Sequence, residues 1–232
     1  MYKGDRYSPS EILYGRRCGR PLRDQNIHLI KSHLPTWKIN LDCPPPVPLK
    51  DIFSHSIDRL KIEIGFGRGE NLLQRAVKMP NVGFIGIEPF INSMVQCLRS
   101  LEELKLQNIR LYDGNAIHLL DWLPDDCIDV IYLLYPDPWT KKKHWKRRFI
   151  SPINLERFSR VLKKDGVVYF SSDIDDYINW TLFHFNRHSS FQWIAKDSSD
   201  WLTPFHGWIP TYYEEKAKVA GRITNYLTFK RI

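Results

Sequence analysis

The amino-acid sequence predicts an α/β fold with a mostly parallel β-sheet and helices on both faces. From residue 60 to residue 187, short apolar runs alternate with amphipathic stretches. The runs are continuous, as expected for strands that are buried on both faces. Repeated strand–helix units of this length imply right-handed crossovers between parallel neighbours. The chain has 232 residues, 43% of them hydrophobic, which is enough for one large domain with a packed core.

Each strand is predicted from an apolar run and each helix from an amphipathic stretch. The first five strands are expected at 60–65, 82–88, 109–113, 128–134 and 167–171. Helices are expected at 70–79, 91–106, 151–163 and 174–187. The last strand, 224–229, follows an irregular stretch instead of a helix. We therefore expect it to enter the sheet antiparallel, through a hairpin with residues 191–197.

The first 50 residues differ in composition from the rest of the chain. They are basic and mixed up to residue 40, and prolines then stiffen residues 43–48 into an extended connector. We divide the chain into a basic N-terminal arm with its connector, residues 1–50, and a folded domain, residues 51–232. The arm fits two interpretations equally well, a second contact for a polyanion and a disordered basic tail.

Charge and cysteine usage narrow the partners and the compartment. The sequence holds 34 Lys and Arg against 26 Asp and Glu, a formal net charge of +8. This balance favours a polyanionic partner, nucleic acid first and an anionic membrane surface second. Four scattered cysteines without a C-x-x-C pair predict a reduced, cytoplasmic setting and no metal site. Because no apolar leader and no uncharged span of about 18 residues occurs, we expect a protein that does not enter a membrane.

A glycine-rich loop closes the first predicted strand, where residues 63–70 read E-I-G-F-G-R-G-E. Glycines let the backbone pass close under a nucleotide-like cofactor. Counted from Gly65 and Gly67, the dinucleotide fingerprint G-x-G-x-x-G would need a glycine where Glu70 stands. Glu63 and Glu70 would also repel a pyrophosphate. The pattern E-x-G-x-G-x-G instead resembles the first motif of class I S-adenosylmethionine-dependent methyltransferases, whose cofactor carries a sulfonium and an ammonium group.

Two further polar residues follow the next two strands. Glu88 ends the second strand, where it is placed to accept hydrogen bonds from two ribose hydroxyl groups, a feature that NAD enzymes share. Asn115 follows the third strand and could bond the adenine edge as donor and acceptor. Each feature alone also fits a turn glycine, a solvated acid or a helix N-cap. Their occurrence at three successive strand ends favours one cofactor site.

The most informative stretch follows the fourth strand. Pro136-Asp137-Pro138-Trp139 sets a carboxylate between two prolines and beside an aromatic ring, and residues 141–148 then carry six Lys and Arg side chains. Such a loop suits a looped-out nucleobase, with the ring for stacking, the carboxylate for the polar edge of the base and the cations for phosphates. A solvated charged surface is the alternative. The tryptophans interleave with the charges as in a nucleic-acid patch.

Residues 136–148 resemble the P-D-P-W-x-K-x-x-H-x-K-R-R signature of the bacterial tRNA (guanine-N7)-methyltransferase family. Residues 172–173 are similar to the family's Thr-Asp or Ser-Asp after the fifth strand, and residues 211–216 resemble its T-x-[FY]-E-x-[RK] signature. The basic stretch 14–22 is similar to the N-terminal segment of some members, so the resemblance covers most of the chain. The sequence departs from the family pattern at three positions, Asn115, Thr140 and Lys143, where many members have Asp, His and Arg.

The resemblance implies a fold, an activity and a set of site residues. The fold is the Rossmann-like class I methyltransferase fold, a mostly parallel seven-stranded sheet with an antiparallel last strand. The activity is transfer of the methyl group of S-adenosylmethionine to N7 of a guanine in tRNA, guanine 46 of the variable loop, with Asp137 as the catalytic residue. Cofactor contacts are implied for Glu63, Gly65, Gly67, Glu88, Asn115 and Asp137. Substrate contacts are implied for Lys141, Asp173, Thr211, Tyr212, Tyr213 and Glu214.

Phosphate contacts with the RNA are expected from Lys142, Lys143, Lys146, Arg147 and Arg148. Trp139 fits two roles, a stacking platform for the guanine and a wall of the cofactor pocket. Three alternatives stay open. The first is a methyltransferase that acts on another RNA base or on an exocyclic amine, because Asp-Pro-Trp also resembles the [DN]-P-P-[FYW] loop of exocyclic-amine methyltransferases. The others are a nonenzymatic RNA-binding module on the same fold and an NAD-dependent dehydrogenase. The sequence does not distinguish a monomer from a homodimer.

Overall fold

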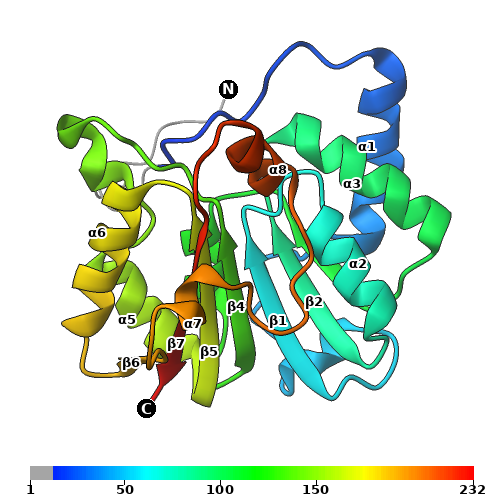
Figure 1. The fold of residues 1–232 in the computed structure, drawn as a ribbon. Helices are drawn as coiled ribbons and strands as arrows, with labels where there is room; N and C mark the ends of the chain where they lie inside the picture. Colours follow the sequence, from blue (N-terminus) through cyan, green and yellow to red (C-terminus); the bar gives the residue numbers. More distant parts are fainter. Residues whose placement is uncertain (1–12) are drawn as a thin grey trace.

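The computed structural model describes residues 13–232, which form a seven-stranded sheet with helices on both faces (Figure 1). The strands are β1 (Arg59–Ile64), β2 (Val82–Ile87), β3 (Ile109–Tyr112), β4 (Ile128–Leu134), β5 (Leu162–Ser172), β6 (Phe191–Trp193) and β7 (Asn225–Arg231). They lie in the order β3-β2-β1-β4-β5-β7-β6. β1 to β5 are parallel, and β7 pairs antiparallel with both β5 and β6. The predicted sheet, with its antiparallel last strand, is confirmed.

Four of the α-helices within residues 13–232 were not predicted from the sequence. All helices are α1 (Asp24–Trp37), α2 (Glu70–Lys78), α3 (Ile91–Leu104), α4 (Ala116–Trp122), α5 (Pro152–Val161), α6 (Asp175–Asn186), α7 (Ser199–Leu202), α8 (Tyr212–Val219) and the 3-10 helices η1 (Leu49–Ile52) and η2 (Lys142–Arg147). The unpredicted α-helices are α1, α4, α7 and α8. Three of these span four to eight residues, too few for a clear 3.6-residue pattern. None of the helices within residues 13–232 has the length and apolar character needed to cross a bilayer.

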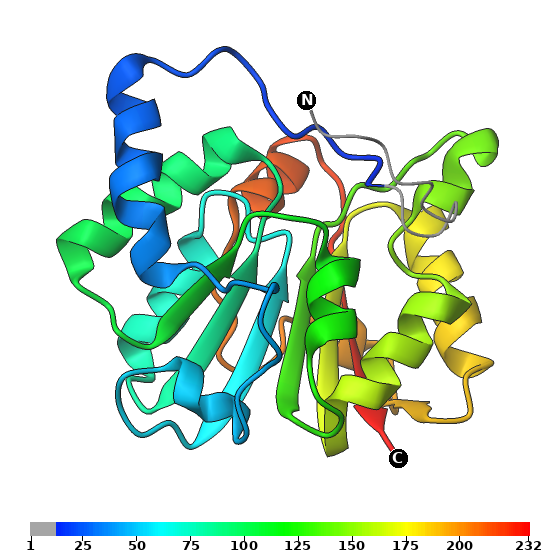
Figure 2. The same cartoon turned by 180° about the vertical axis from the view of Figure 1, so that it is seen from behind.

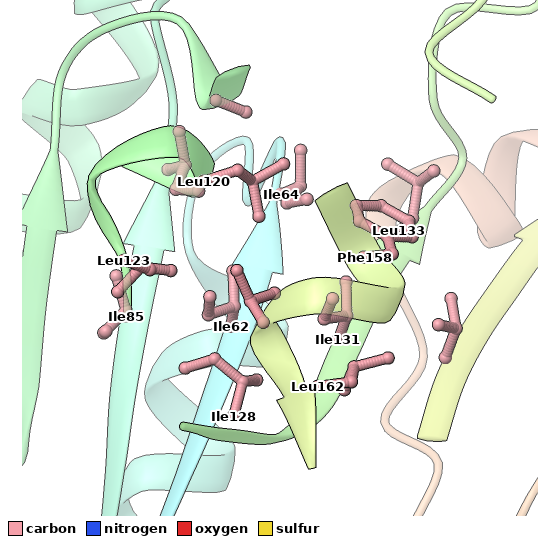
Figure 3. Packing of buried hydrophobic residues seen from close by; sticks show 14 of the residues in the cluster. Ile62, Ile64, Ile85, Leu120, Leu123, Ile128, Ile131, Leu133, Phe158 and Leu162 are labelled. Atoms are coloured by element: carbon pink, nitrogen blue, oxygen red, sulfur yellow. The ribbon is translucent and has the colours of Figure 1, made fainter. Parts of the chain in front are cut away.

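Two hydrophobic clusters hold the layers together, one on each face of the sheet. On one face, α4, α5 and α6 pack against β1, β4 and β5; Figure 3 shows Leu120 of α4 and Phe158 of α5 over Ile62 and Ile131 of the strands. On the other face, α1, α2 and α3 pack against β2 and β3 (Figures 1 and 2). There α2 lies close to the sheet at Gly86 of β2: a Cβ on this glycine would lie only 2.5 Å from a methyl carbon of Leu72.

Part of the predicted N-terminal arm packs on the domain. Leu34 and Trp37 of α1 are buried with α3, and the amide of Ile39 donates to the carbonyl oxygen of Leu111 at the edge strand β3 (2.8 Å). Residues 1–12 of the predicted arm lie outside the described residues. The division of the chain at residue 50 stays a prediction, and the structure adds that α1 shares a hydrophobic cluster with the domain.

The carboxyl ends of the parallel strands meet at one edge of the sheet. The strand order reverses between β1 and β4, and open α/β sheets bind ligands outside the strand ends at such a switch point. α8 lies over this edge, and the N-terminal segment before α1 also runs along it (Figure 1). The residues predicted to form the site are carried by the loops of this edge.

Candidate active site

The glycine loop joins β1 to α2 and leaves an open cradle. Its first amide, that of Gly65, donates to the carbonyl oxygen of Ile87 on the neighbouring strand (2.8 Å). Gly65 and Gly67 have φ of 75° and 58°, in the left-handed region that favours glycine. A Cβ at either position would meet no atom within 4 Å. The loop therefore offers backbone, free of side chains, to a ligand.

A cavity of about 200 Å³ lies against this loop. It is lined by Glu63, Gly65, Phe66, Gly67, Arg68, Glu70, Asn71, Phe90, Ser93, Leu134, Thr211, Tyr212 and Tyr213. The predicted cofactor residues of β1 thus share one cavity with three of the predicted substrate residues, which come from a segment almost 150 residues later in the chain.

Glu88 braces the glycine loop. Its Oε2 accepts from the amide of Gly67 (2.8 Å) and its Oε1 from the amide of Phe90 (2.9 Å). Burial raises the pKa of Glu88, the two amides oppose this rise, and the charge of Asp137 adds to it. An ionised carboxylate has about four acceptor sites, so Glu88 can also accept from ribose hydroxyl groups while it holds the loop.

Glu63 is a buried acid in the cavity wall. It is 4% exposed, and its Oε2 has no hydrogen-bond partner among the described residues. Burial raises its pKa to about 8, Arg75 opposes this rise, and Glu70 and Glu88 add to it. An acceptor without a partner, held beside two further acids, fits a cationic group and would repel a pyrophosphate. These carboxyl groups therefore fit the ammonium group of S-adenosylmethionine and disfavour the pyrophosphate of NAD.

Asn115 is the N-cap of α4 at the carboxyl end of β3. It is 7% exposed, and its Oδ1 accepts from the amide of Ile117 (3.2 Å). Asn115 thus acts as a helix N-cap, and this hydrogen bond fixes the orientation of its side-chain amide, which is the group predicted to bond adenine.

The loop after β4 holds Asp137 in a constrained backbone. Tyr135 and Trp139 on either side have φ of 50° and 42°, conformations that cost residues with a Cβ about 1–3 kcal/mol. The backbone amide of Tyr135 donates to the carbonyl oxygen of Ser171 (2.9 Å), and the phenol hydroxyl of Tyr135 is hydrogen-bonded to the hydroxyl of Thr224 (2.9 Å). The carboxylate of Asp137 is exposed at the sheet edge, and partial shielding from water raises its pKa. The surrounding strands thus stabilise an otherwise unfavourable loop.

A second cavity, of about 300 Å³, lies on the outer side of Asp137. It is lined by Asp137, Pro138, Trp139, Thr140, Lys141 and His144. Trp139 faces this cavity, edge-on to the ring of His144 at 5.8 Å, and is not part of the lining of the cavity at the glycine loop. Trp139 therefore lines a cavity other than the one at the glycine loop, and the choice between its two predicted roles stays a prediction.

The cations after Trp139 divide into an exposed and an inward-facing set. Lys141, Lys142, Lys143 and Lys146 are exposed on or beside η2. Arg147 is half-buried, with its guanidinium 4.9 Å from the ring centre of Trp139. The lysines therefore provide most of the positive surface that the sequence predicted.

The prediction that Arg148 contacts phosphate is corrected by the structure. Arg148 is 3% exposed, and its guanidinium stacks on the rings of Trp145 (4.7 Å), Tyr177 (5.0 Å) and Trp180 (5.3 Å). Its Nε donates to the carbonyl oxygen of Pro138 (2.8 Å). A charge enclosed by rings and main-chain oxygens is not presented to solvent, so this residue anchors the loop.

The segment with the T-x-[FY]-E-x-[RK] signature borders the cavity at the glycine loop, which we call the inner cavity; the second cavity, beside Trp139, is the outer cavity. Thr211 is the N-cap of α8, and its hydroxyl accepts from the amide of Glu214 (3.1 Å). The ring of Tyr212 lies 4.7 Å from the guanidinium of Arg68 on the glycine loop. The ring of Tyr213 stacks on Tyr135 at 6.4 Å. Three of the predicted substrate residues of this segment, Thr211, Tyr212 and Tyr213, are thus brought to the glycine loop.

Glu214 lies inside the protein. It is 2% exposed, its Oε1 accepts from the hydroxyl of Tyr226 (2.9 Å) and from Nζ of Lys218 (3.0 Å), and its Oε2 accepts from Nε1 of Trp208 (2.7 Å). Both oxygens are thus engaged, and this carboxylate fastens α8 to β7. Its contact with the substrate stays a prediction.

Asp173, after β5, is partly exposed and forms an ion pair with Arg222 (2.5 Å). This residue stays at the sheet edge, where it was predicted, and the arginine that follows α8 occupies its carboxylate.

Comparisons with known proteins identify the family. A family model described as "Putative methyltransferase" matches residues 58–226. The chain is 54% identical, over the full length of both proteins, to the tRNA (guanine-N(7)-)-methyltransferase of Agrobacterium fabrum. It is 52% identical to that of Rhizobium johnstonii, over 96% of each chain. The chain belongs to the tRNA (guanine-N7)-methyltransferase family.

Solved structures of other methyltransferases share the fold. The 16S rRNA methyltransferase KamB aligns with a TM-score of 0.53 over 80% of this chain and 94% of its own, at 10% identity. A precorrin-6y C5,15-methyltransferase from Geobacter metallireducens aligns with a TM-score of 0.51 over 80% and 89%, at 13% identity. The fold is that of the class I methyltransferases, and S-adenosylmethionine is the methyl donor of this family member.

Sequence reasoning missed how the N-terminal segment of this family member lies on the site. The amide of Ile91 donates to the carbonyl oxygen of Arg17 (3.0 Å), and the amide of Gly19 donates to Oδ1 of Asn92 (2.8 Å). A Cβ on Gly15 would lie 4.0 Å from Oδ2 of Asp137. The segment therefore spans from α3 to the Asp-Pro-Trp loop. Its family resemblance was visible in the sequence, but no spacing indicated where it would dock.

Proposed function

We propose that the protein methylates N7 of a guanine in tRNA, at guanine 46 of the variable loop, and releases S-adenosylhomocysteine. The observation that carries the proposal is that Asp137 lines the outer cavity and lies near residues of the inner one. Asp137 lines the outer one, and its charge raises the pKa values of Glu88 and Tyr213 beside the inner one. A base in the outer cavity would meet a cofactor in the inner cavity at this carboxylate. Relatives about 50% identical carry the corresponding name.

The inner cavity is the proposed cofactor site. The backbone of Gly65 and Gly67 would pass under the ligand, the carboxylate of Glu63 would hold the ammonium group, and Glu88 would accept from the ribose hydroxyl groups. Asn115 would bond the adenine edge from its position at the start of α4. When bound, S-adenosylmethionine supplies a methyl group on a positively charged sulfur atom.

Catalysis in this proposal depends on alignment more than on proton transfer. Guanine N7 has a lone pair and no proton, so no residue of the chain has to act as a base. The N7–carbon bond would form as the carbon–sulfur bond breaks, and the positive charge would pass from sulfur to the guanine ring. Asp137 would accept hydrogen bonds from guanine N1–H and N2–H, hold the ring in line and stabilise the charge that it gains.

Substrate contacts are proposed on both sides of Asp137. Trp139 would stack on the base in the outer cavity, and Lys141 would hold an adjacent phosphate. Tyr212 and Tyr213 would border the base from the cofactor side. Asp173 would share the polar edge of the guanine after Arg222 turns to an RNA phosphate.

RNA binding beyond the target base is proposed for the exposed cations of the loop. Lys142, Lys143 and Lys146, with Arg147 beside them, form the proposed phosphate footprint, in keeping with the net charge of +8. A tRNA substrate and four cysteines without a paired motif support a cytoplasmic location.

The nature of the methylated nucleoside tests the proposal. Purified protein is incubated with bulk tRNA and S-adenosylmethionine labelled on the methyl group, and the tRNA is digested to nucleosides. N7-methylguanosine is the expected product. N6-methyladenosine or N2-methylguanosine would support the exocyclic-amine alternative instead, and RNA binding without any methylation would support the nonenzymatic module.

A further inference from the structure

We propose that Asn71 and Arg75 are positioning residues that couple the cofactor cavity to the substrate segment, residues 209–213. The inference rests on the proposed function, since it takes the inner cavity as the cofactor site. Both residues lie on α2, behind the glycine loop, and neither belongs to the motifs that identify the family. They are 2% and 3% exposed, so they act inside the protein.

The amide of Asn71 joins two parts of the site. Its Nδ2 donates to the carbonyl oxygen of Ile209 (3.0 Å), and its Oδ1 accepts from Nε of Arg75 (2.6 Å). Because one end of the amide faces a donor and the other an acceptor, its orientation is fixed. Asn71 also lines the cofactor cavity. A ligand in that cavity therefore meets a side chain that is bonded to the substrate segment.

Arg75 connects this amide to Glu63. Its guanidinium lies 4.3 Å from the ring centre of Tyr132 on β4 and 6.0 Å from that of Phe205. Its charge opposes the burial that raises the pKa of Glu63. Nη2 of Arg75 and Oε2 of Glu63 are both buried without a hydrogen-bond partner in the part of the chain that the structure describes. A donor atom of Arg75 and an acceptor atom of Glu63 can thus each form one more hydrogen bond at the boundary between the cavity and α2.

Movement at Ile209 would be transmitted to the cavity wall. Ile209 is 3% exposed, and Thr211, the N-cap of α8, follows two residues later. Phe205, four residues before the segment, stacks on Tyr169 of β5 at 4.0 Å. The chain that leads into the segment is therefore held on β5, and the bond from Asn71 holds the first residue of the segment. Thr211, Tyr212 and Tyr213 line the cavity themselves, and the Asn71 bond adds a connection between that cavity and α2.

The coupling has a direction that follows from charge. A cationic group of the cofactor beside Glu63 would favour the ionised carboxylate, attract the guanidinium of Arg75 and, through its Nε, tighten the orientation of Asn71. The segment at Ile209 would then be more ordered with the cofactor present. The cofactor would thereby raise the affinity for tRNA. By thermodynamic linkage, bound tRNA would raise the affinity for the cofactor by the same factor.

Hydrogen exchange and binding measurements on the full chain test this inference. S-adenosylhomocysteine is added at concentrations that saturate each variant, and amide exchange is followed in residues 209–214. Its dissociation constant is then measured with and without tRNA. In the wild type we expect slower exchange in this segment and an affinity increase with tRNA of about 5- to 150-fold, the usual range for coupled sites.

Two substitutions interrupt the proposed connection at different bonds. Asn71→Asp keeps an acceptor for Arg75 but removes the donor to Ile209, and Arg75→Lys keeps a cation near Glu63 but removes the Nε donor to Asn71. Both should reduce the tRNA effect on cofactor affinity to less than twofold and abolish the cofactor-dependent protection. Gln74→Ala, on the exposed side of α2, is the control and should behave as the wild type.

The possible outcomes separate this inference from the proposed function. If both variants keep the wild-type protection and the wild-type tRNA effect, the coupling does not pass through these residues and the inference is wrong. If one variant does not fold, as judged by its melting curve, the other decides by the same criterion. A wild type that binds the cofactor product with segment protection but makes no N7-methylguanosine would overturn the proposed function alone.

Discussion

The guanidinium of Arg148 donates from Nε to the carbonyl oxygen of Pro138 over 2.8 Å, which ties the end of the cationic segment back to the residue that follows Asp137. Its Nη1 donates to the carbonyl oxygen of Asp176 at the start of α6 (3.0 Å). One buried cation thus fixes the spacing between the Asp-Pro-Trp loop and a helix on the other side of η2. The loop owes its shape to this arginine as much as to its two prolines.

Replacing Arg148 should destabilise the fold without changing the electrostatic footprint on RNA. Arg148→Met removes two hydrogen bonds and three cation–π contacts, and we expect a loss of about 2–4 kcal/mol in the free energy of unfolding. Urea denaturation measures this loss. The salt dependence of RNA affinity should stay as in the wild type. A stable variant with a weaker salt dependence would return Arg148 to the set of phosphate contacts.

Replacing the exposed lysines should weaken the salt dependence of RNA affinity and leave the stability of the fold nearly unchanged. The triple variant Lys142→Ala, Lys143→Ala and Lys146→Ala should reduce the slope of log affinity against log salt concentration by about 2 to 3, since each lost phosphate contact removes about 0.7–0.9. Its stability should be near that of the wild type, because these side chains are exposed. Lys78→Ala, at the far end of α2, is the control. An unchanged slope in the triple variant would remove η2 from the footprint.

Asp137→Asn should lower turnover on tRNA by on the order of 100-fold or more. The amide keeps the size of the side chain but replaces one acceptor by a donor that faces guanine N1–H or N2–H, and it removes the negative charge near the methylated ring. The turnover number at saturating tRNA and S-adenosylmethionine is the relevant measurement. Asp58→Asn, before β1 at the opposite edge of the sheet, is the matched control. Wild-type turnover in Asp137→Asn would show that this residue does not align the base.

The sheet could be predicted from sequence because buried parallel strands have a local signature. The run at 128–134 is apolar except for Asp129, and the structure places β4 on the same residues. β7 was predicted to be antiparallel from the irregular stretch before it, and that stretch is where α7 and α8 lie. α1 was missed because its buried face is made by only two residues, Leu34 and Trp37, and a proline stands in its last turns.

The site was predicted less completely because burial of a charged residue depends on partners far away in the chain. Nothing local distinguishes Arg148 from Arg147, and the rings that enclose Arg148 come partly from α6, about 30 residues later. The partners of Glu214 likewise lie on both sides of it, at Trp208 and Tyr226. A motif identifies residues that lie near a site, whereas the side that each faces is decided by the packing.

Glu63 should make stability depend on pH in the absence of cofactor. The folded protein binds its proton more tightly than the unfolded chain, since burial raises the pKa from an ordinary 4.5 to about 8. Stability therefore falls as the pH rises from about 4.5 to about 8, by about 1.4 kcal/mol for each unit of pKa difference, and is constant above that window. Glu63→Gln lacks this loss, so its advantage over the wild type should grow through the window.

Chemical denaturation at a series of pH values measures this difference, with Glu103→Gln on the exposed side of α3 as the control that should show no trend. Added S-adenosylhomocysteine should shrink the difference, because its ammonium group beside Glu63 favours the ionised carboxylate and lowers its pKa. A stability advantage of Glu63→Gln that is the same at pH 5 and pH 8 would mean that the carboxylate is already ionised in the free protein, and that the cavity meets its cofactor with a fixed negative charge.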